Sequence, residues 1–362
     1  MDHSFDQIRQ LQIRGIKSIA ECDIELKALN VLVGANGAGK SNLIFAFKLL
    51  RKTLEAIEGV GDKALETFVS YEAGADSILH YGRKHTKSAR IAFILQQHDG
   101  QSDYIKHEAI LIANAQNKFD PPSHIVYNTP TEDWFRPRDY FQAFIRGISI
   151  HHINDTTPES NLMKNPHIED TFKVYESFVN LPAFLNMLQN NFPDYFNDIV
   201  KMIRRIAPFF EGFVLEFEPG GKSIRLRWKH YNSDDPFDVS ALSDGTLRFI
   251  ALATLLLQPQ ETLPSLIIID EPELGLHPQA IQYLAAMLRS CSARTQIIVA
   301  TQSVTLLDQF TWKDLIITDF LNGASRFRRL SEEESKTWVE DYSLGELWTG
   351  NWLGGVPGWR DD

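Results

Sequence analysis

Apolar residues alternate with polar ones over much of residues 10–33, with the period of two that is typical of strands in a sheet. The pattern predicts strands near residues 11–16, 24–26 and 29–33. The third strand runs into a glycine-rich segment, residues 34–41, and a helical pattern then extends to about residue 57. A strand, a glycine loop and a helix in this order form the setting of phosphate-binding loops.

The middle of the chain, residues 61–235, has a mixed pattern. Strands are predicted at residues 89–95 and 104–112, helices at 170–190 and 195–206, and a hairpin at 213–217 and 223–228. In the second of these helices Ile199, Ile203 and Ile206 recur at helical spacing, so one face should be buried. We therefore expect an insertion that forms a second lobe of mixed strands and helices.

Beyond residue 235 the patterns become regular again. Helices are predicted at residues 242–257 and 280–289, and strands at 266–270 and 296–300. Both strands are short and continuously apolar, as strands in a parallel sheet buried on both faces must be. The order of elements predicts an α/β fold divided into residues 1–60, 61–235 and 236–362, in which the first and last parts form one lobe.

The composition fits a folded globular chain. Of its 362 residues 43% are hydrophobic and 23% charged, which is enough for one large domain with an insertion. No apolar run is long enough to span a bilayer, and the first residues lack the apolar stretch of a signal peptide. The distant Cys22 and Cys291 predict buried, inert thiols. We expect a cytoplasmic protein without a membrane partner.

The formal net charge is −11, whereas a protein that holds nucleic acid over its whole surface is usually basic. The acidity favours a protein partner, or DNA contact through another subunit, although it leaves room for a local basic groove. Basic residues cluster at 83–90 and at 201–205. We interpret both clusters as solvated surface, with a contact to nucleic acid or an acidic partner as the alternative for the first.

The glycine-rich segment matches the pattern G-x-x-x-x-G-K-[ST]. Glycines let backbone N–H groups turn inward around phosphate oxygens, and the following helix adds the positive end of its dipole. Lys40 can reach the β- and γ-phosphates of a nucleotide, and the Ser41 hydroxyl can ligate Mg²⁺. The residues expected to bind nucleotide here are Gly34, Asn36, Gly37, Ala38, Gly39, Lys40, Ser41 and Asn42.

Two carboxylates, Asp270 and Glu271, come at the end of an apolar strand. Asp270 can reach a Mg²⁺ ion held by Ser41, and Glu271 can orient and deprotonate an attacking water. A chance acidic pair in a strand-end turn is the alternative, and the phosphate loop upstream argues against it.

A third motif, residues 242–248, opens the predicted apolar helix. Ser243 and Gly245 would place a hydroxyl and open N–H groups at the helix N-terminus, which makes a second anion site. Taken alone, the motif is equally typical of a serine that caps its own helix.

In this order the motifs resemble the ABC ATPases, in their RecF/SMC-like branch. The resemblance rests on GANGAGKS, LSDGTLR, LIIIDEPELGLHP and ATQS, and on the N-terminal IRGIKSI. The chain is also similar to small stand-alone bacterial ATPases of that branch, which are associated with genome maintenance or anti-phage defence. Their tail is similar to residues 344–357 here. The resemblance covers the first 60 and the last 130 residues well and the middle thinly.

The resemblance implies a P-loop NTPase fold of the ABC ATPase head type, and hydrolysis of ATP with Mg²⁺. Ser41 and Asp270 would hold the metal, and Glu271 would be the general base, with Lys40 and Gln302 as further catalytic residues.

In such ATPases the signature of one subunit completes the ATP site of the other, so that two ATPs lie between two head-to-tail subunits. Ser243 and Gly245 would be the signature here, and His277 would lie near the partner's site. The resemblance therefore implies a homodimer, with higher oligomers left open.

Two positions depart from the family pattern. Asp244 stands where the signature commonly has glycine, and its carboxylate must point away from a γ-phosphate to avoid repelling it. Gln302 stands where many relatives have a histidine, and glutamine can donate to a phosphate oxygen or a water but carries no charge. We therefore expect slow hydrolysis, with ATP acting as a timer or switch.

Two further groups of residues leave alternatives open. His151, His152 and Asp155 form a weak candidate for a metal site, and the resemblance favours a nucleotide-sensing loop near Asp155 and Thr156 instead. The tryptophans of the glycine-rich tail would either cap the core or form an exposed aromatic patch for a partner. They are Trp348, Trp352 and Trp359.

The biological role is inferred from what the sequence lacks. It has no heptads for a coiled-coil arm, no nuclease motif and about 60 residues after Ser303, so we expect a switch without its own effector. The leading hypothesis is an ATP-gated dimer that regulates a separate nuclease or toxin, encoded nearby, in anti-phage defence. The alternatives are a RecF-like repair ATPase that acts directly on DNA, and a nucleotide-locked assembly hub with negligible turnover.

Overall fold

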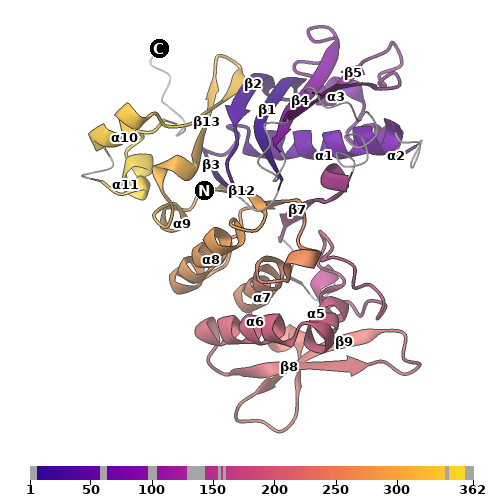
Figure 1. Cartoon of the computed structure of the whole chain (residues 1–362), viewed down its shortest axis with the longest axis vertical. Helices are drawn as coiled ribbons and strands as arrows, with labels where there is room; N and C mark the ends of the chain where they lie inside the picture. Colours follow the sequence, from indigo (N-terminus) through magenta and orange to yellow (C-terminus); the bar gives the residue numbers. More distant parts are fainter. Residues whose placement is uncertain are drawn as a thin grey trace.

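The computed structural model describes residues 6–57, 63–96, 104–128, 143–153, 156–157, 160–338 and 342–354. Over these residues the chain forms an upper body, which contains two large sheets, and a lower lobe of helices with one small sheet (Figure 1). Among the described residues no helix combines the length and the apolar character needed to cross a membrane.

The central sheet has the strand order β14-β13-β3-β12-β11-β7. Its strands are β3 Leu29–Val33, β7 Ile148–His152, β11 Leu266–Asp270, β12 Gln296–Thr301, β13 Leu315–Leu321 and β14 Ala324–Arg328. All neighbouring pairs are parallel except β13 and β14. Strand β11 is continuously apolar because Ile268 enters the core on one face of the sheet, whereas Ile267 and Ile269 enter the core on the other. The buried parallel strands predicted at 266–270 and 296–300 are confirmed.

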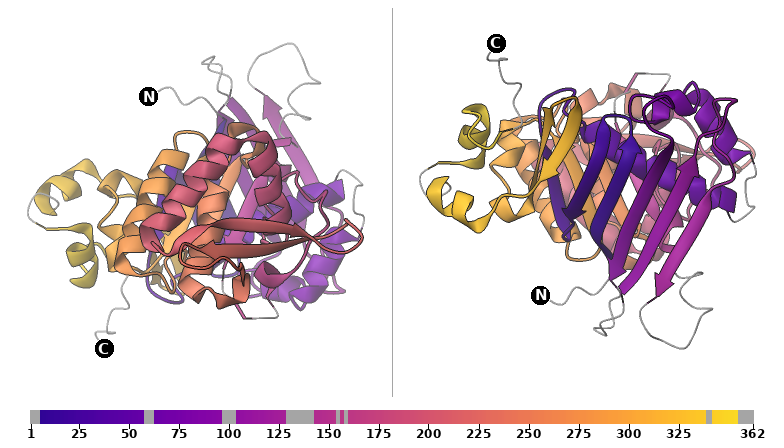
Figure 2. Two further views of the ribbon diagram at one scale, coloured as in Figure 1. Left: turned by 90° about the horizontal axis from the view of Figure 1, so that it is seen from below. Right: turned by 90° about the horizontal axis from the view of Figure 1, so that it is seen from above.

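A second, antiparallel sheet covers one side of the central sheet and has the order β2-β1-β4-β5-β6 (Figure 2, right). Its strands are β1 Gln7–Ile16, β2 Ile19–Glu25, β4 Ser88–Gln96, β5 Tyr104–Ile112 and β6 Ser123–Asn128. Helix α1, Lys40–Ile57, shares one hydrophobic core with both sheets, to which it contributes Leu43, Phe47 and Leu50. Two short helices accompany it, α2 Ala64–Tyr71 and α3 Ala75–Ile78. This core fixes the start of α1 at the edge where the parallel strands end.

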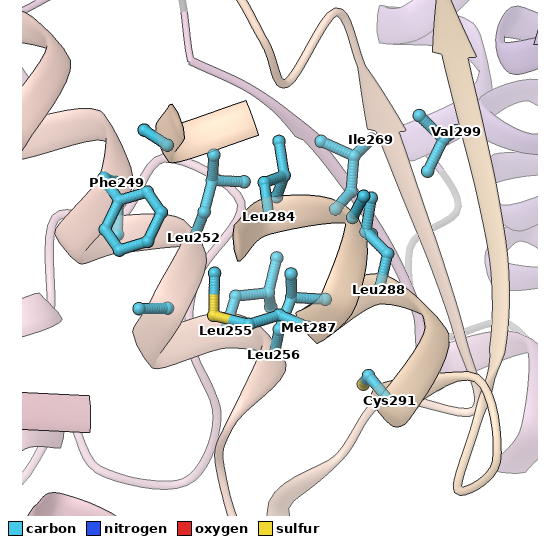
Figure 3. Packing of buried hydrophobic residues seen from close by; sticks show 14 of the residues in the cluster. Phe249, Leu252, Leu255, Leu256, Ile269, Leu284, Met287, Leu288, Cys291 and Val299 are labelled. Carbon is cyan, nitrogen blue, oxygen red and sulfur yellow. The ribbon is translucent and has the colours of Figure 1, made fainter. Parts of the chain in front are cut away.

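The lower lobe packs against the other face of the central sheet. Its elements are α5 Leu181–Asn191, α6 Pro193–Ile206, β8 Phe210–Phe217, β9 Ile224–His230, β10 Phe237–Asp238 and α7 Asp244–Leu256. Helix α8, Pro278–Cys291, joins this lobe to the sheet. Figure 3 shows Phe249 and Leu252 of α7 and Leu284 of α8 in one cluster with Ile269 and Val299 of the sheet. Helix α7, which the third motif opens, is therefore packed into the same core as the strand that ends in Asp270.

The segment predicted as one insertion contributes to three sheets. Strands β4, β5 and β6 extend the sheet begun by β1 and β2, and β7 forms the edge of the central sheet beside β11. The remainder, from α5 to β9, belongs to the lower lobe. The domain boundaries at residues 60 and 235 stay predictions.

One predicted helix is much shorter than expected. The helical pattern over residues 170–190 corresponds to a helix only at α5, because the buried Asn180 side chain binds the backbone before it. Its Nδ2 donates to the carbonyl oxygens of Asp170 at 2.8 Å and Lys173 at 2.7 Å, and its Oδ1 accepts from the Tyr175 N–H. An asparagine that satisfies a loop in this way competes with helix formation.

The C-terminal part packs beside β13. Its helices are α9 Val304–Leu307, α10 Glu332–Trp338 and α11 Leu344–Thr349. Trp348 is buried in the main core, whereas Trp352 is 46% exposed and stacks edge-on with Tyr342 at 4.6 Å. One tryptophan of the tail thus caps the core and one lies at the surface, and Trp359 lies outside the described residues. The two cysteines are free and buried, as predicted.

Candidate nucleotide-binding site

Most of the predicted site residues meet at the carboxyl edge of the central sheet. Parallel strands β3, β12, β11 and β7 end side by side there, and the loop after each strand can contribute a side chain. A cavity of about 290 Å³ lies at this edge. It is lined by Asn36, Gly37, Gly39, Lys40, Ser41, Asn42, His152, Asp270, Glu271 and Gln302. The fold therefore brings together in one cavity the phosphate loop, the carboxylate pair and Gln302, which are far apart in the sequence.

The glycine loop has the backbone of a phosphate cradle. Gly37 has a φ of 80° and Gly39 a φ of 119°. Residues other than glycine rarely adopt these values. A Cβ atom at Gly39 would also collide with the Ser325 side chain. Beside the loop, Asn42 donates to the Ser18 hydroxyl at 2.6 Å and so ties the first turn of α1 to the β1–β2 hairpin. The loop fits a polyphosphate as the sequence predicts.

Lys40 is held inside this loop. Its side chain is buried, and its Nζ donates to the carbonyl oxygens of Gly34 at 2.5 Å and Ala35 at 3.0 Å. Burial lowers the pKa of Lys40, and the carboxylates of Glu271 and Asp270 act in the opposite direction. A cation at the start of a helix, among inward N–H groups, is the arrangement that a polyphosphate requires.

Asp270 and Ser41 offer oxygen ligands to the same cavity. Ser41 is exposed at the first turn of α1, and Asp270 is the last residue of β11. Burial raises the pKa of Asp270, and the neighbouring His152 and Lys40 oppose that rise. A carboxylate, a hydroxyl and phosphate oxygens are hard ligands of the kind that Mg²⁺ prefers, so the donor set fits this ion.

Glu271 and Gln302 are joined by a hydrogen bond. Gln302 donates from Nε2 to Glu271 Oε1 at 2.8 Å and to Asn36 Oδ1 at 2.6 Å. Glu271 has a φ of 48°, and its N–H donates to the Ala300 carbonyl at 2.8 Å. A residue other than glycine in this backbone region persists where its surroundings hold it, which is common in functional sites. The predicted base is thus held between the phosphate loop and β12.

The histidines of β7 lie on opposite faces of the strand. His152 lines the cavity, and its Nδ1 donates to the Asp270 carbonyl at 3.2 Å and lies 3.8 Å from Asp270 Oδ2. His151 is buried on the other side, against Phe178, with its Nε2 2.6 Å from the Ser149 hydroxyl. Burial lowers the pKa of His151 to about 4. The two rings therefore cannot bind one metal ion.

No group of three or more potential metal ligands of the His, Cys, Asp and Glu types occurs among the described residues, and Asp155 lies outside them. Sequence reasoning placed His152 in a weak metal motif and missed its position beside Asp270. The parallel pairing of His152 with Asp270, which no local pattern reveals, creates that position.

Glu273 is a second residue that the sequence reasoning missed. It is buried, and burial raises its pKa, while a hydrogen bond from Thr301 opposes that rise. The signal was the unusual carboxylate in the turn Glu271-Pro272-Glu273, directly after an apolar strand.

The third motif lies apart from the cavity lining. Ser243 is exposed, and its hydroxyl caps α7 by accepting the Thr246 N–H at 3.2 Å. Gly245 packs so closely on the loop after β11 that a Cβ atom would lie 2.5 Å from the Gly275 carbonyl oxygen. His277 caps α8, where its Nδ1 accepts the Gln279 N–H at 3.3 Å. Ser243, Gly245 and His277 do not line the cavity of their own chain.

The fold and the cavity define a P-loop ATPase. Residues 29–308 match the model of the family described as AAA domain, putative AbiEii toxin, Type IV TA system, and the chain belongs to this family. P-loop ATPases bind their nucleotide together with Mg²⁺, in agreement with the cavity.

The chain is also similar to individual known proteins. It is 24% identical over 345 residues to the Old nuclease of Escherichia phage P2, a match that covers 83% of this chain and 57% of that protein. The chain therefore spans little more than half the length of this curated relative.

Solved structures of Smc head domains share the fold. A SmcHead bound to the C-winged helix domain of ScpA has a TM-score of 0.63 at 17% identity, with 91% of this chain and 99% of that chain covered. An Smc head domain with an extended coiled coil from Pyrococcus furiosus has a TM-score of 0.61 at 15% identity, with 93% and 99% covered. At these identities the likeness shows the fold alone, and it confirms the predicted α/β P-loop class.

Proposed function

We propose that this protein is an ATP-dependent switch that closes as a head-to-tail dimer around two ATP–Mg²⁺ and controls a separate effector. ATP would close the dimer, and hydrolysis would release it. The effector proposed is a nuclease or toxin of an anti-phage defence system, encoded nearby.

The proposal of a head-to-tail dimer rests on one observation. The cavity holds the phosphate loop, the two carboxylates and Gln302, whereas Ser243 lies exposed at the N-terminus of another helix and does not line it. A helix N-terminus attracts anions through its open N–H groups. In a head-to-tail pair the Ser243 helix of each chain would meet the γ-phosphate bound by the other, so that each site would use both chains.

The residues of the cavity would divide the hydrolysis reaction among them. Lys40 and the loop would hold the phosphates, and Glu271 would take a proton from the attacking water, which Gln302 would orient. Mg²⁺, held by Ser41 and Asp270, would neutralise charge on the phosphates. Gln302 is neutral where a histidine could carry charge, which supports slow turnover.

Two comparisons support an effector in defence. The family description includes the words toxin and TA system, and the curated relative is named a nuclease and is longer than the matched region. Direct action on DNA is the competing function. In the first basic cluster Arg83 pairs with Asp76 at 2.8 Å and Arg90 with Glu108 at 2.9 Å, so part of its charge is already neutralised.

Native mass spectrometry of the Glu271→Gln protein, expressed together with the products of its flanking genes, tests the proposal. With ATP and Mg²⁺ we expect a dimer that retains two nucleotides and a neighbouring protein. A bare ATP-dependent dimer would refute the effector and shift the interpretation to direct DNA binding, to be measured at several salt concentrations. A protein that stays monomeric with ATP bound would refute the switch.

A further inference from the structure

Glu273 is a buried carboxylate just outside the cavity. Only 8% of its surface is exposed, and it lies in the loop between β11 and α8, two residues after Glu271. A carboxylate is costly to bury unless it is well hydrogen-bonded or serves a function. In the part of the chain that the structure describes, its Oε2 accepts no hydrogen bond. Packing alone therefore gives no reason for a carboxylate here.

The other oxygen of Glu273 holds the end of β12. Its Oε1 accepts the Thr301 hydroxyl at 2.5 Å and lies 3.4 Å from the Gln302 backbone nitrogen, which donates to it. The Thr301 oxygen in turn accepts the N–H of Ser303 at 3.0 Å. Three consecutive residues at the point where β12 leaves the sheet are thus tied directly or indirectly to one carboxylate.

The residue fixed in this way is the one that contacts Glu271. With its backbone held by Glu273, the Gln302 side chain spans from Asn36 of the phosphate loop to the Glu271 carboxylate. The loop that carries Glu271 and Glu273 is joined to β12 at a second point, where the Glu271 N–H donates to Ala300. The chain of contacts therefore runs from Glu273 through Thr301 and Gln302 to the predicted base.

We propose that Glu273 is a positioning residue for ATP hydrolysis, which orients Gln302 and, through it, Glu271. This role rests on the proposed ATPase function, and it adds a residue that does not line the cavity. A small displacement of groups around a reacting water reduces turnover by roughly 10- to 100-fold, although the substrate still binds.

Two substitutions separate this role from simple packing. Glu273→Gln keeps an acceptor oxygen and the same shape, so that both hydrogen bonds can persist, whereas Glu273→Leu has a similar size and no acceptor. Thr301→Val removes the bridging hydroxyl with little change in shape. We expect Glu273→Leu and Thr301→Val to lower the rate of turnover, and Glu273→Gln to retain most of the wild-type rate.

The test measures single-turnover ATP hydrolysis and the affinity for a fluorescent ATP analogue, in the wild type and in each variant, with and without Gln302→Ala. Glu273→Leu should lower the rate about 10-fold or more and change the affinity less than about twofold. In the Gln302→Ala protein the same substitution should have almost no further effect, because both changes break one path.

Three outcomes would overturn the role. They are an unchanged rate in Glu273→Leu, a rate loss that multiplies with that of Gln302→Ala, and a loss that appears in affinity alone. If Glu273→Leu does not fold, Thr301→Val carries the same test with the same expected non-additivity. A wild-type protein that binds but never hydrolyses ATP would refute the proposed function and this role with it, whereas an active wild type with a fully active Glu273→Leu would refute the role alone.

Discussion

Helices α1 and α7 both begin with backbone N–H groups, which attract anions. Of these two helix starts, only that of α1 lies among the charged and polar side chains of the cavity. The start of α1 carries the buried Lys40 and faces Asp270, Glu271 and Gln302 across one cavity. The start of α7 is exposed, and the Ser243 hydroxyl caps its own helix. The contrast agrees with the proposed head-to-tail dimer, in which the start of α7 would complete the site of the partner chain.

The two regions are also held by different kinds of contact. Glu271 and Gln302 are hydrogen-bonded to each other and tied to β12 and the phosphate loop. The α7 start instead packs on the loop after β11 through Gly245, and Arg248 donates to the Leu274 carbonyl at 3.0 Å. Since Leu274 follows Glu271 by three residues, a partner bound at α7 would be linked to the predicted base through one hydrogen bond and a short stretch of backbone.

The largest expected effect comes from the base itself. Glu271→Gln keeps the shape and the hydrogen bond to Gln302 but removes the proton acceptor, so turnover should fall by roughly 10²–10⁴-fold. Nucleotide affinity should stay within about twofold of the wild type, because glutamine still fits the site. Parallel rate and binding measurements on Glu271→Gln, with the exposed Glu261→Gln as control, check this. Normal turnover in Glu271→Gln would show that another group is the base.

Loss of Lys40 should weaken the binding of nucleotide at the start of α1. Lys40→Ala removes a charge-assisted contact to phosphate worth about 1.5–3 kcal/mol, which corresponds to roughly 10- to 100-fold in affinity. Titration with a fluorescent ATP analogue measures it, and Lys52→Ala on the same helix is the control. Equal affinities for the two variants would contradict the phosphate role of Lys40.

A substitution at the start of α7 should affect the formation of dimers and leave nucleotide binding almost unchanged. Ser243→Arg places a bulky side chain at the proposed dimer contact, so binding of ATP to the monomer should change less than about twofold while ATP-dependent dimers disappear. Ser343→Arg is a matched control, because Ser343 caps α11 with the same geometry, accepting the Glu346 N–H at 3.2 Å. Each variant loses one helix cap, at a cost of about 1 kcal/mol of folding stability. Comparison with Ser343→Arg therefore separates this loss of stability from an effect on the dimer. A Ser243→Arg protein that still dimerises would contradict the assignment.

The smallest effect concerns Asp244. Its exposed carboxylate, at the first position of α7, would lie near a partner's phosphates. Removal of this repulsion by Asp244→Asn should strengthen the ATP-bound dimer by about two- to fivefold at low salt and by less at high salt. Sedimentation at two ionic strengths measures the effect, and a weaker dimer would show that Asp244 contributes a favourable contact.

Local sequence predicted the parts of the fold and site that depend on local chemistry. The glycine loop, Lys40, Asp270 and Glu271 lie where their motifs indicate because strand, turn and helix patterns are short-range. His152 and Glu273 were missed since their positions depend on the pairing of β7 with β11 and on the contact of a loop with β12. The helix predicted at 170–190 was too long because Asn180 satisfies the backbone of the preceding loop.

The most direct test of sites shared between two chains is a mixing experiment. Lys40→Ala and Ser243→Arg proteins are each assayed alone and then combined, because only a mixed dimer contains one site with an intact Lys40 and an intact Ser243 from different chains. The account predicts that two inactive proteins recover ATP hydrolysis on mixing. A mixture that stays inactive, although both proteins fold and Ser243→Arg still binds ATP, would contradict it.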